Sequence, residues 1–220
     1  MVQRNWHPRQ LSIPPCLPRR APALDGGRQM APRVLGHDGG VAQTWVALLR
    51  GINVGGHRRV PMATLRTAYA QVGCLSVATY IQSGNVVLDH SEADPAVLAT
   101  MLEEVVLQAC GVDARVVLRR ADQWTAMVDA NPFVDLDPAF LNVTFLADAP
   151  DPALVADVEG RDLGADRVRV VASHLYAWLP DGVLGARLSG AQVERLLGAG
   201  TARNWRTVVK ITDLIAARAL

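Results

Sequence analysis

The chain has 220 residues and a mass of 23.6 kDa; half of its residues are hydrophobic and one fifth are charged. This size and composition exclude a disulfide-stapled miniprotein and a chain that is disordered throughout. No apolar run approaches the length that crosses a bilayer, so we expect no membrane association. The formal net charge is only +1, which gives no global argument for binding nucleic acid or a lipid surface.

The cysteines are few and scattered. Cys16, Cys74 and Cys110 are an odd number, and no C-x-x-C spacing occurs among them. The sequence also has no zinc or calcium motif and no G-x-S-x-G nucleophile motif. We therefore expect reduced thiols in a cytoplasmic protein, with no metal and no cofactor, while the question of enzymatic activity stays open.

Residues 1–43 form an extension of distinct composition. Residues 1–40 hold six of the 13 prolines and carry a net charge of +4, whereas the remaining 180 residues carry −3. Proline interrupts helices and strand ladders, and no periodicity is visible here, so we expect a largely disordered extension. An arginine-rich targeting segment, a basic arm for nucleic acid, and a dispensable extension with a mature start near Val41 are alternative interpretations.

Residues 44–120 alternate between strand and helix patterns joined by short connections. Pro61 and Pro95 each suit a first helical position, and Asp94 is a suitable N-cap. The expected elements are a strand at 45–49, a helix at 61–72, strands at 77–81 and 86–88, a helix at 95–109 and a strand at 114–118. This order predicts a split β-α-β unit of ferredoxin-like type.

Residues 121–220 begin the same order again after a short helix at 124–129. The expected elements are a strand at 141–146, a short helix opening at 151–152, strands at 168–171 and 176–179, a helix after Ser189 and a final helix at 203–217. The final helix takes the place of the expected closing strand. We therefore predict an α+β protein with two ferredoxin-like subdomains in tandem, the second of them incomplete.

The glycine-rich loop from Arg50 to Arg59 lies in a stretch without acidic residues, 41–88. Arg50, Asn53, Gly55 and Gly56 are candidates for an anion site, because glycines let backbone N–H groups approach an anion and a helix N-terminus follows. The loop is neither a P-loop nor a dinucleotide fingerprint. Alternatively, the glycines only turn the strand toward the helix.

Two further segments offer polar groups. Gln82, Ser83 and Asn85 surround a glycine in an expected hairpin turn, and they could serve the turn or a ligand. Arg203 and Asn204 lie at the start of the last expected helix, in the second acid-free stretch, 195–212. Trp205 could stack on a ring, although its phase with other apolar residues is more typical of a core position.

These segments carry a resemblance to a known family. The motifs, in chain order, are VALLRGINVGG at 46–56, YIQSGNVV at 80–87, NPF at 131–133, and RNW at 203–205 with Thr207. They resemble the uncharacterised bacterial family catalogued as domain of unknown function 1697, over about residues 44–217. The resemblance implies a cytoplasmic α+β protein with ferredoxin-like subdomains, and its shared polar positions are Arg50, Asn53, Gln82, Ser83, Asn85, Arg203 and Asn204.

The chain also departs from the family pattern. His57 and Arg187 stand where lysines are common, Ala202 where a threonine is usual, and Arg206 where asparagine is usual. Arginine retains the positive charge of lysine but does not replace it as a nucleophile. The replacements therefore favour anion binding over covalent catalysis. The only lysine of the chain is Lys210, so a general preference for arginine also accounts for the replacements.

The sequence thus suggests a cytoplasmic protein that binds a small phosphate-bearing ligand, with or without turning it over, where the three polar segments converge. The alternatives are a nucleic-acid-binding module and a structural or protein-interaction domain without a ligand. Aromatic residues make up only 5% of the chain, which weakens the analogy with sheets that stack RNA bases. Arginines open to one groove would favour a ligand site, and arginines paired with carboxylates would favour a structural role.

Overall fold

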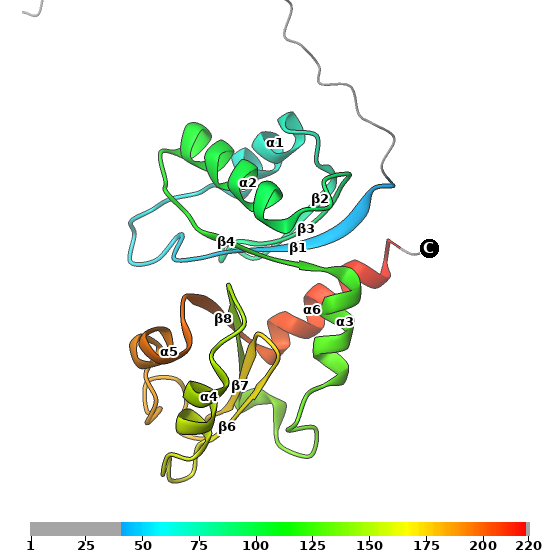
Figure 1. Cartoon of the computed structure of the whole chain (residues 1–220). Coiled ribbons are helices and arrows are strands. Elements are labelled where there is room, and N and C mark those ends of the chain that lie inside the picture. Colours follow the sequence, from blue (N-terminus) through cyan, green and yellow to red (C-terminus); the bar gives the residue numbers. More distant parts are fainter. Residues whose placement is uncertain (1–40, 219–220) are drawn as a thin grey trace, which may run out of the picture. The chain divides into compact units, whose positions relative to one another are not determined.

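The computed structural model describes residues 41–218, and the predicted disorder of residues 1–43 falls almost wholly outside them. The described chain is a mixed α+β fold with two four-stranded antiparallel sheets (Figure 1). The first sheet and its helices comprise β1 (Gln43–Leu49), α1 (Met62–Gln71), β2 (Leu75–Tyr80), β3 (Asn85–His90), α2 (Pro95–Cys110) and β4 (Val116–Arg120). The later elements are α3 (Ala121–Asp129), the 3-10 helix η1 (Pro138–Phe140), β5 (Leu141–Leu146), α4 (Pro152–Glu159), β6 (Arg167–Val171), β7 (His174–Trp178), α5 (Gly190–Leu197), β8 (Gly200–Asn204) and α6 (Trp205–Ala216).

Both sheets have the same strand order relative to the chain. The first is ordered β2-β3-β1-β4 and the second β6-β7-β5-β8, with every neighbouring pair antiparallel. In each sheet, the strand that comes first along the chain lies in the interior, and the strand that comes last lies at an edge. The repeated strand, helix, strand, strand, helix, strand order of the sequence is therefore present twice.

The second sheet is complete, so the prediction of an incomplete second unit was wrong. Residues 200–204 form β8, which pairs with β5 in a register that sets Arg203 opposite Val143. The last helix begins only at Trp205, with Asn204 as its N-cap. The strand escaped detection because its inward-facing residues, Thr201 and Arg203, are polar and give no apolar alternation.

The predicted helix caps agree with the structure. The side chain of Asp94 accepts a hydrogen bond from the backbone N–H of Ala96 at 2.8 Å, and Pro95 occupies the first position of α2. Ser189 and Gln192 form a reciprocal capping box at the start of α5. These local signals fix where the helices begin independently of the tertiary packing.

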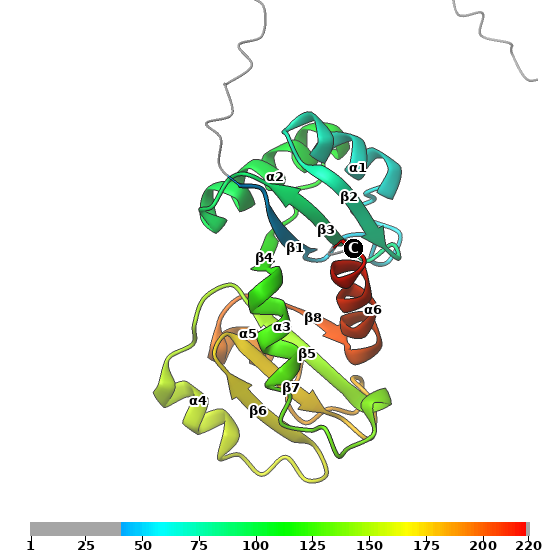
Figure 2. The ribbon, with the colours of Figure 1, turned by 90° about the vertical axis from the view of Figure 1, so that its right-hand side faces the viewer.

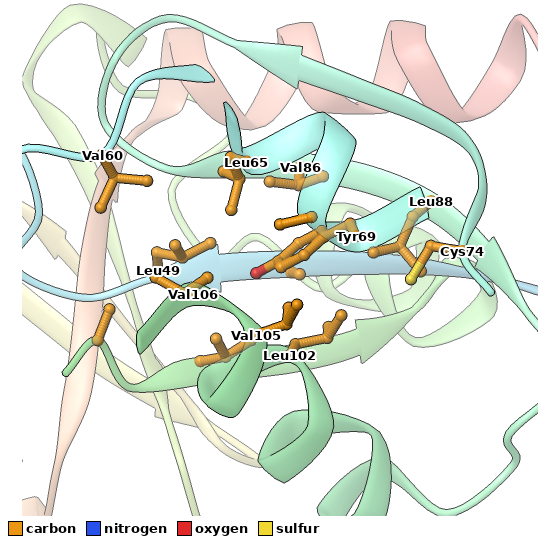
Figure 3. Packing of buried hydrophobic residues seen from close by; sticks show 14 of the residues in the cluster. Leu49, Val60, Leu65, Tyr69, Cys74, Val86, Leu88, Leu102, Val105 and Val106 are labelled. Carbon is orange, nitrogen blue, oxygen red and sulfur yellow. The ribbon is translucent and has the colours of Figure 1, made fainter. Parts of the chain in front are cut away.

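Each face of the first sheet has its own apolar core. Trp45, Ala47 and Leu49 of β1 face α1 and α2. Figure 3 shows part of the core that lies between this face of the sheet and the two helices. Val46 and Leu48 face a second cluster, which includes side chains of α3, α6 and the second sheet. Because β1 is buried on both faces, its sequence is a continuous apolar run rather than an alternating one.

Helices α3 and α6 lie side by side (Figures 1 and 2) and both contribute to this second cluster. The Nε1 of Trp124 in α3 donates to the Oγ1 of Thr212 in α6 at 3.1 Å. Just after α6, Arg218 forms an ion pair with Asp89 of β3 at 2.9 Å. The last helix of the chain is thus attached to the first sheet. No helix in the stretch from 41 to 218 combines the length and the apolar character needed to cross a membrane.

Candidate functional site

Arg203 is the centre of a polar network that joins three distant segments. Its Nε donates to Oδ1 of Asn85, and its Nη1 donates to Oγ1 of Thr201 at 2.6 Å and to the carbonyl of Ala202 at 2.8 Å. Its Nη2 donates to the carbonyl of Leu49 at 2.9 Å and to that of Ser83 at 3.2 Å. A guanidinium has five N–H groups, and here each one has an acceptor.

The acceptors around Arg203 are all neutral. Burial lowers the pKa of the Arg203 guanidinium to about 10, so the group remains charged at neutral pH. Its charge is stabilised by oriented carbonyl, amide and hydroxyl oxygens rather than by a carboxylate. An anion could reach this guanidinium only by displacing hydrogen bonds that already exist, so Arg203 supports the fold.

Asn85 fixes the turn between β2 and β3. Only 1% of the residue is exposed, and its Nδ2 donates to the carbonyl of Tyr80 at 3.1 Å and to Oγ of Ser83 at 2.9 Å. The turn also approaches β1 closely: a Cβ added to Gly84 would lie 2.7 Å from the Cβ of Leu49. The end of β1, this turn and β8 therefore converge on Arg203.

Asn53 shapes the glycine-rich loop. Its backbone has a φ of 55°, and its side chain exchanges two hydrogen bonds with the backbone of Val60, at 2.9 and 3.0 Å. Its Nδ2 also donates to the carbonyl of Gln82 at 2.7 Å. Asn204 has a comparable local role, because its Oδ1 accepts from the N–H of Thr207 at 2.9 Å. Both side-chain amides therefore form hydrogen bonds with the backbone.

Arg50 differs from Arg203 in its surroundings. Its Nη2 lies 2.5 Å from Oε2 of Glu194 in α5, and the two side chains are 36% and 47% exposed. The hydrogen bond from Arg50, followed by its charge, lowers the pKa of the Glu194 carboxyl. An ion pair this exposed contributes little to stability and exchanges readily with other anions.

Arg50 also lines a surface hollow of about 440 Å³, the Arg50 hollow. Its lining residues are Arg50, Gly51, Arg58, Asp113 and Arg115. Arg58 is held in place by donating to the carbonyls of Gly51 and Asp113. The side chain of Arg115 is 77% exposed, and it contacts Glu103 at 3.3 Å. Three guanidinium groups thus share one concave surface.

The other predicted residues do not line the Arg50 hollow. Gly55 and Gly56 are exposed, and within residues 41–218 their backbone N–H groups donate to no other residue. The side chain of Gln82 is exposed, and Ser83 takes part in the Arg203 network. Of the predicted residues, Arg50 alone belongs to the hollow.

Sequence reasoning missed Arg115 as a site residue. It comes to Arg50 through the sheet, since the N–H of Arg50 donates to the carbonyl of Arg115 at 2.9 Å. No local pattern connects two residues that are 65 positions apart. The arginines of the glycine-rich loop stand close together in the sequence and can be recognised as a group, but Arg115 lies outside that loop.

A second buried arginine was also missed. Arg119 of β4 donates from Nε to Nε2 of His174 at 2.9 Å and from Nη2 to Oγ of Ser173 at 2.9 Å. Burial lowers the pKa of Arg119 to about 10. Burial, followed by the charge of Arg119, lowers the pKa of His174 to about 4. His174 is therefore neutral near pH 7 and accepts at Nε2.

Residues 41–218 contain no group of three or more histidine, cysteine or carboxylate side chains that could hold a metal ion. Cys74 and Cys110 are free thiols whose pKa values are raised by burial. A raised pKa suppresses the thiolate, which is the nucleophilic form. Neither cysteine has the surroundings of an activated nucleophile.

Comparisons with known proteins agree with the sequence motifs. The model of the family described as "Protein of unknown function (DUF1697)" matches residues 42–176. The solved structure of the conserved bacterial protein SP0830 from Streptococcus pneumoniae is similar, with a TM-score of 0.66 and 23% sequence identity, over 80% of this chain and 99% of that one. No protein with a curated description matches the chain. On the extent of the family match, the chain belongs to the DUF1697 family.

Proposed function

We propose that the protein binds a small phosphate-bearing ligand at the Arg50 hollow. The observation that carries the proposal is the presence of Arg50, Arg58 and Arg115 on one concave surface of about 440 Å³. Guanidinium groups match the geometry of phosphate oxygens and bind them in a bidentate manner. Within residues 41–218, the side chains of Arg50 and Arg115 each form a single ion pair, and they are 36% and 77% exposed, so little is lost when a phosphate replaces their partners.

The proposed roles of the polar motif residues fall into two groups. Arg50 binds the ligand, and Gly55, Gly56 and Gln82 are further motif positions that are open to solvent. The remaining residues hold the loop and the turn in place: Asn53, Ser83, Asn85, Arg203 and Asn204. Asp113 also lines the hollow, and its carboxylate favours ligands that bring a hydroxyl group beside the phosphate.

The proposal includes the finer architecture. The shared strand order of the two sheets supports a tandem of ferredoxin-like subdomains, at about 44–120 and 121–220. In this arrangement all the residues that line the Arg50 hollow belong to the first subdomain, and Glu194 of the second subdomain is the ion-pair partner of Arg50. A cytoplasmic location is part of the same proposal, since phosphorylated metabolites are abundant there.

The packing does not favour the nucleic-acid alternative. Sheets that recognise RNA stack bases on an open face. Here Val46, Leu48 and Val87 of the first sheet are buried in a core that also includes α3 and α6. A structural role agrees with the bonding of Arg203, but the exposed arginines of the hollow contribute little to such a role.

Thermal unfolding of the full chain with inorganic phosphate, ribose 5-phosphate and a short single-stranded RNA tests the proposal. A ligand at 100 times its dissociation constant adds about 2.7 kcal/mol of stability, a rise in Tm of roughly 5 to 10 °C for a chain of this size. We expect a rise with the phosphates that Arg50→Gln and Arg115→Gln each reduce, while Arg195→Gln, a change at an exposed arginine of α5, retains it. A flat response, or a rise unaffected by the first two variants, would overturn the proposal.

A further inference from the structure

A second hollow, of about 420 Å³, lies at the start of α6 and is distinct from the Arg50 hollow. We call it the Trp205 hollow; its lining residues include Tyr80, Asp137, Trp205, Arg206, Lys210 and Asp213. They come from the end of β2, the segment before η1 and the first turns of α6. Two aromatic rings and two cationic side chains therefore face one space, and none of them lines the Arg50 hollow.

The two aromatic residues of the Trp205 hollow are partly buried and are not stacked on other rings of the described chain. Trp205 is half-buried against the core that contains Val208 and Ile211, which fixes one side of its indole. The backbone of Tyr80 is held through its carbonyl, which accepts from Nδ2 of Asn85 at 3.1 Å, and the residue is half-buried. Among residues 41–218, neither ring is paired with another aromatic ring. Because no other aromatic ring of the described chain is paired with them, a planar group from outside could be.

The charged side chains of the Trp205 hollow differ in whether they already have a partner within the protein. Lys210 lies 3.6 Å from the carboxylate of Asp213, and Oδ1 of Asp137 accepts from the N–H of Ala139 at 2.9 Å. Arg206 is exposed, and in the described part of the chain it has neither an ion pair nor a hydrogen bond from its side chain. Arg206 is therefore the cation available to an incoming anion, while the two carboxylates can accept from hydroxyl groups.

We infer that the Trp205 hollow binds a planar heteroaromatic ring that carries a phosphate, the chemistry of a nucleoside monophosphate. Aromatic side chains recognise the ring because every base has a π-face. Arg206 binds the phosphate, with Lys210 beside it, and a carboxylate accepts from the ribose hydroxyls. This inference is independent of the function proposed for the Arg50 hollow, because the two sites have no lining residue in common.

Calorimetric titration of the full chain with AMP, adenosine and ribose 5-phosphate separates the contributions of the ring and of the phosphate to binding. We expect AMP to bind more tightly than either fragment, because only AMP presents both the ring and the phosphate. Arg206→Gln should weaken AMP binding by about tenfold and leave adenosine unchanged. Tyr80→Leu should weaken AMP and adenosine alike. Arg195→Gln, which changes an exposed arginine elsewhere on the surface, should change neither.

Three outcomes would overturn the inference. They are no binding of AMP at millimolar concentration, equal affinity for AMP and ribose 5-phosphate, and AMP binding that Arg206→Gln leaves intact. If AMP binding is lost in Arg50→Gln and retained in Arg206→Gln, the Trp205 hollow is excluded while the function proposed for the Arg50 hollow stands. Loss in Arg206→Gln with retention in Arg50→Gln supports the inference whatever the fate of the first proposal.

Discussion

The Nε of Arg203 donates a hydrogen bond to Oδ1 of Asn85, a residue 118 positions earlier in the chain. Nδ2 of the same amide donates to the carbonyl of Tyr80 and to Oγ of Ser83. The orientation of the amide is therefore fixed by the turn, and its oxygen is presented to the guanidinium. One arginine of β8 is thereby connected to the turn between β2 and β3.

Replacing Arg203 should strongly destabilise the protein. Arg203→Ala removes five hydrogen bonds and leaves the buried Oδ1 of Asn85 without its donor. Each lost bond to a charged group and each buried orphan costs about 1 to 3 kcal/mol, so we expect a loss of at least 3 kcal/mol in the free energy of unfolding. Urea unfolding measures it, with Arg195→Ala as a control that changes less than about 0.5 kcal/mol. A change as small as the control's would show that the network is dispensable.

Gly84 and Gly111 form a matched pair of glycines with positive φ, 73° and 66°. A Cβ at Gly84 would lie 2.7 Å from the Cβ of Leu49, whereas a Cβ at Gly111 would meet nothing within 4 Å. Alanine at either position suffers the backbone strain of about 1 kcal/mol, but only at Gly84 must the core also shift. We expect Gly84→Ala to cost about 2 kcal/mol more than Gly111→Ala in urea unfolding. Equal costs would contradict the close approach of the turn to β1.

The hydroxyl group of Tyr69 lies in the first apolar core (Figure 3), and among residues 41–218 it has no hydrogen-bond partner; burial raises its pKa. Tyr69→Phe removes an unsatisfied polar group, so we expect the free energy of unfolding to stay the same or to rise by about 1 kcal/mol. Tyr176 is the matched control, because its hydroxyl donates to the carbonyl of Met127 at 2.6 Å. Tyr176→Phe should cost about 1 kcal/mol or more. The reverse order of the two variants would refute this account of the core.

The Arg119–His174 contact predicts a pH dependence of stability. The pKa of His174 is about 4 in the folded protein, against an ordinary value of 6.5. Between these two values the unfolded chain binds the proton and the folded chain does not, so stability falls as the pH falls from about 6.5 to about 4. The loss amounts to about 3 kcal/mol at most and stops below the lower value.

His174→Gln isolates this contribution from that of the carboxylates. Glutamine offers an oxygen to Nε of Arg119 and does not titrate. Urea midpoints measured from pH 4 to pH 7 should therefore vary less with pH in the variant than in the native chain. Identical slopes would mean that His174 titrates normally in the folded state.

The local signals of the sequence predicted most of the fold. Asp94 with Pro95 and Ser189 with Gln192 marked helix starts that the structure confirms. The strand predicted at 45–49 is present as β1, which begins two residues earlier at Gln43. The closing strand β8 was missed because Thr201 and Arg203 face inward and are polar, so the pattern that signals a strand is absent there.

The candidate site was less predictable. Arg203 does contact the turn at Ser83–Asn85 and the end of β1, but Arg203, Asn85 and Asn53 bond to the protein itself, a distinction that depends on tertiary contacts. Arg115 reaches the Arg50 hollow only through the pairing of β1 with β4. Residue types and spacing indicate where polar side chains gather, but they do not reveal which of these side chains already form all their hydrogen bonds within the protein.

The most direct test of the account is an NMR titration of the full chain with inorganic phosphate, observed at backbone amides and arginine Nε groups. The account predicts saturable shifts at Arg50, Gly51, Arg58 and Arg115, which line the Arg50 hollow, with the Nε–H signal of Arg203 unchanged. Arg50→Gln should weaken the binding. Shifts centred on Arg203, or no saturable shift in the hollow, would contradict the division between an anion-binding arginine and a structural one.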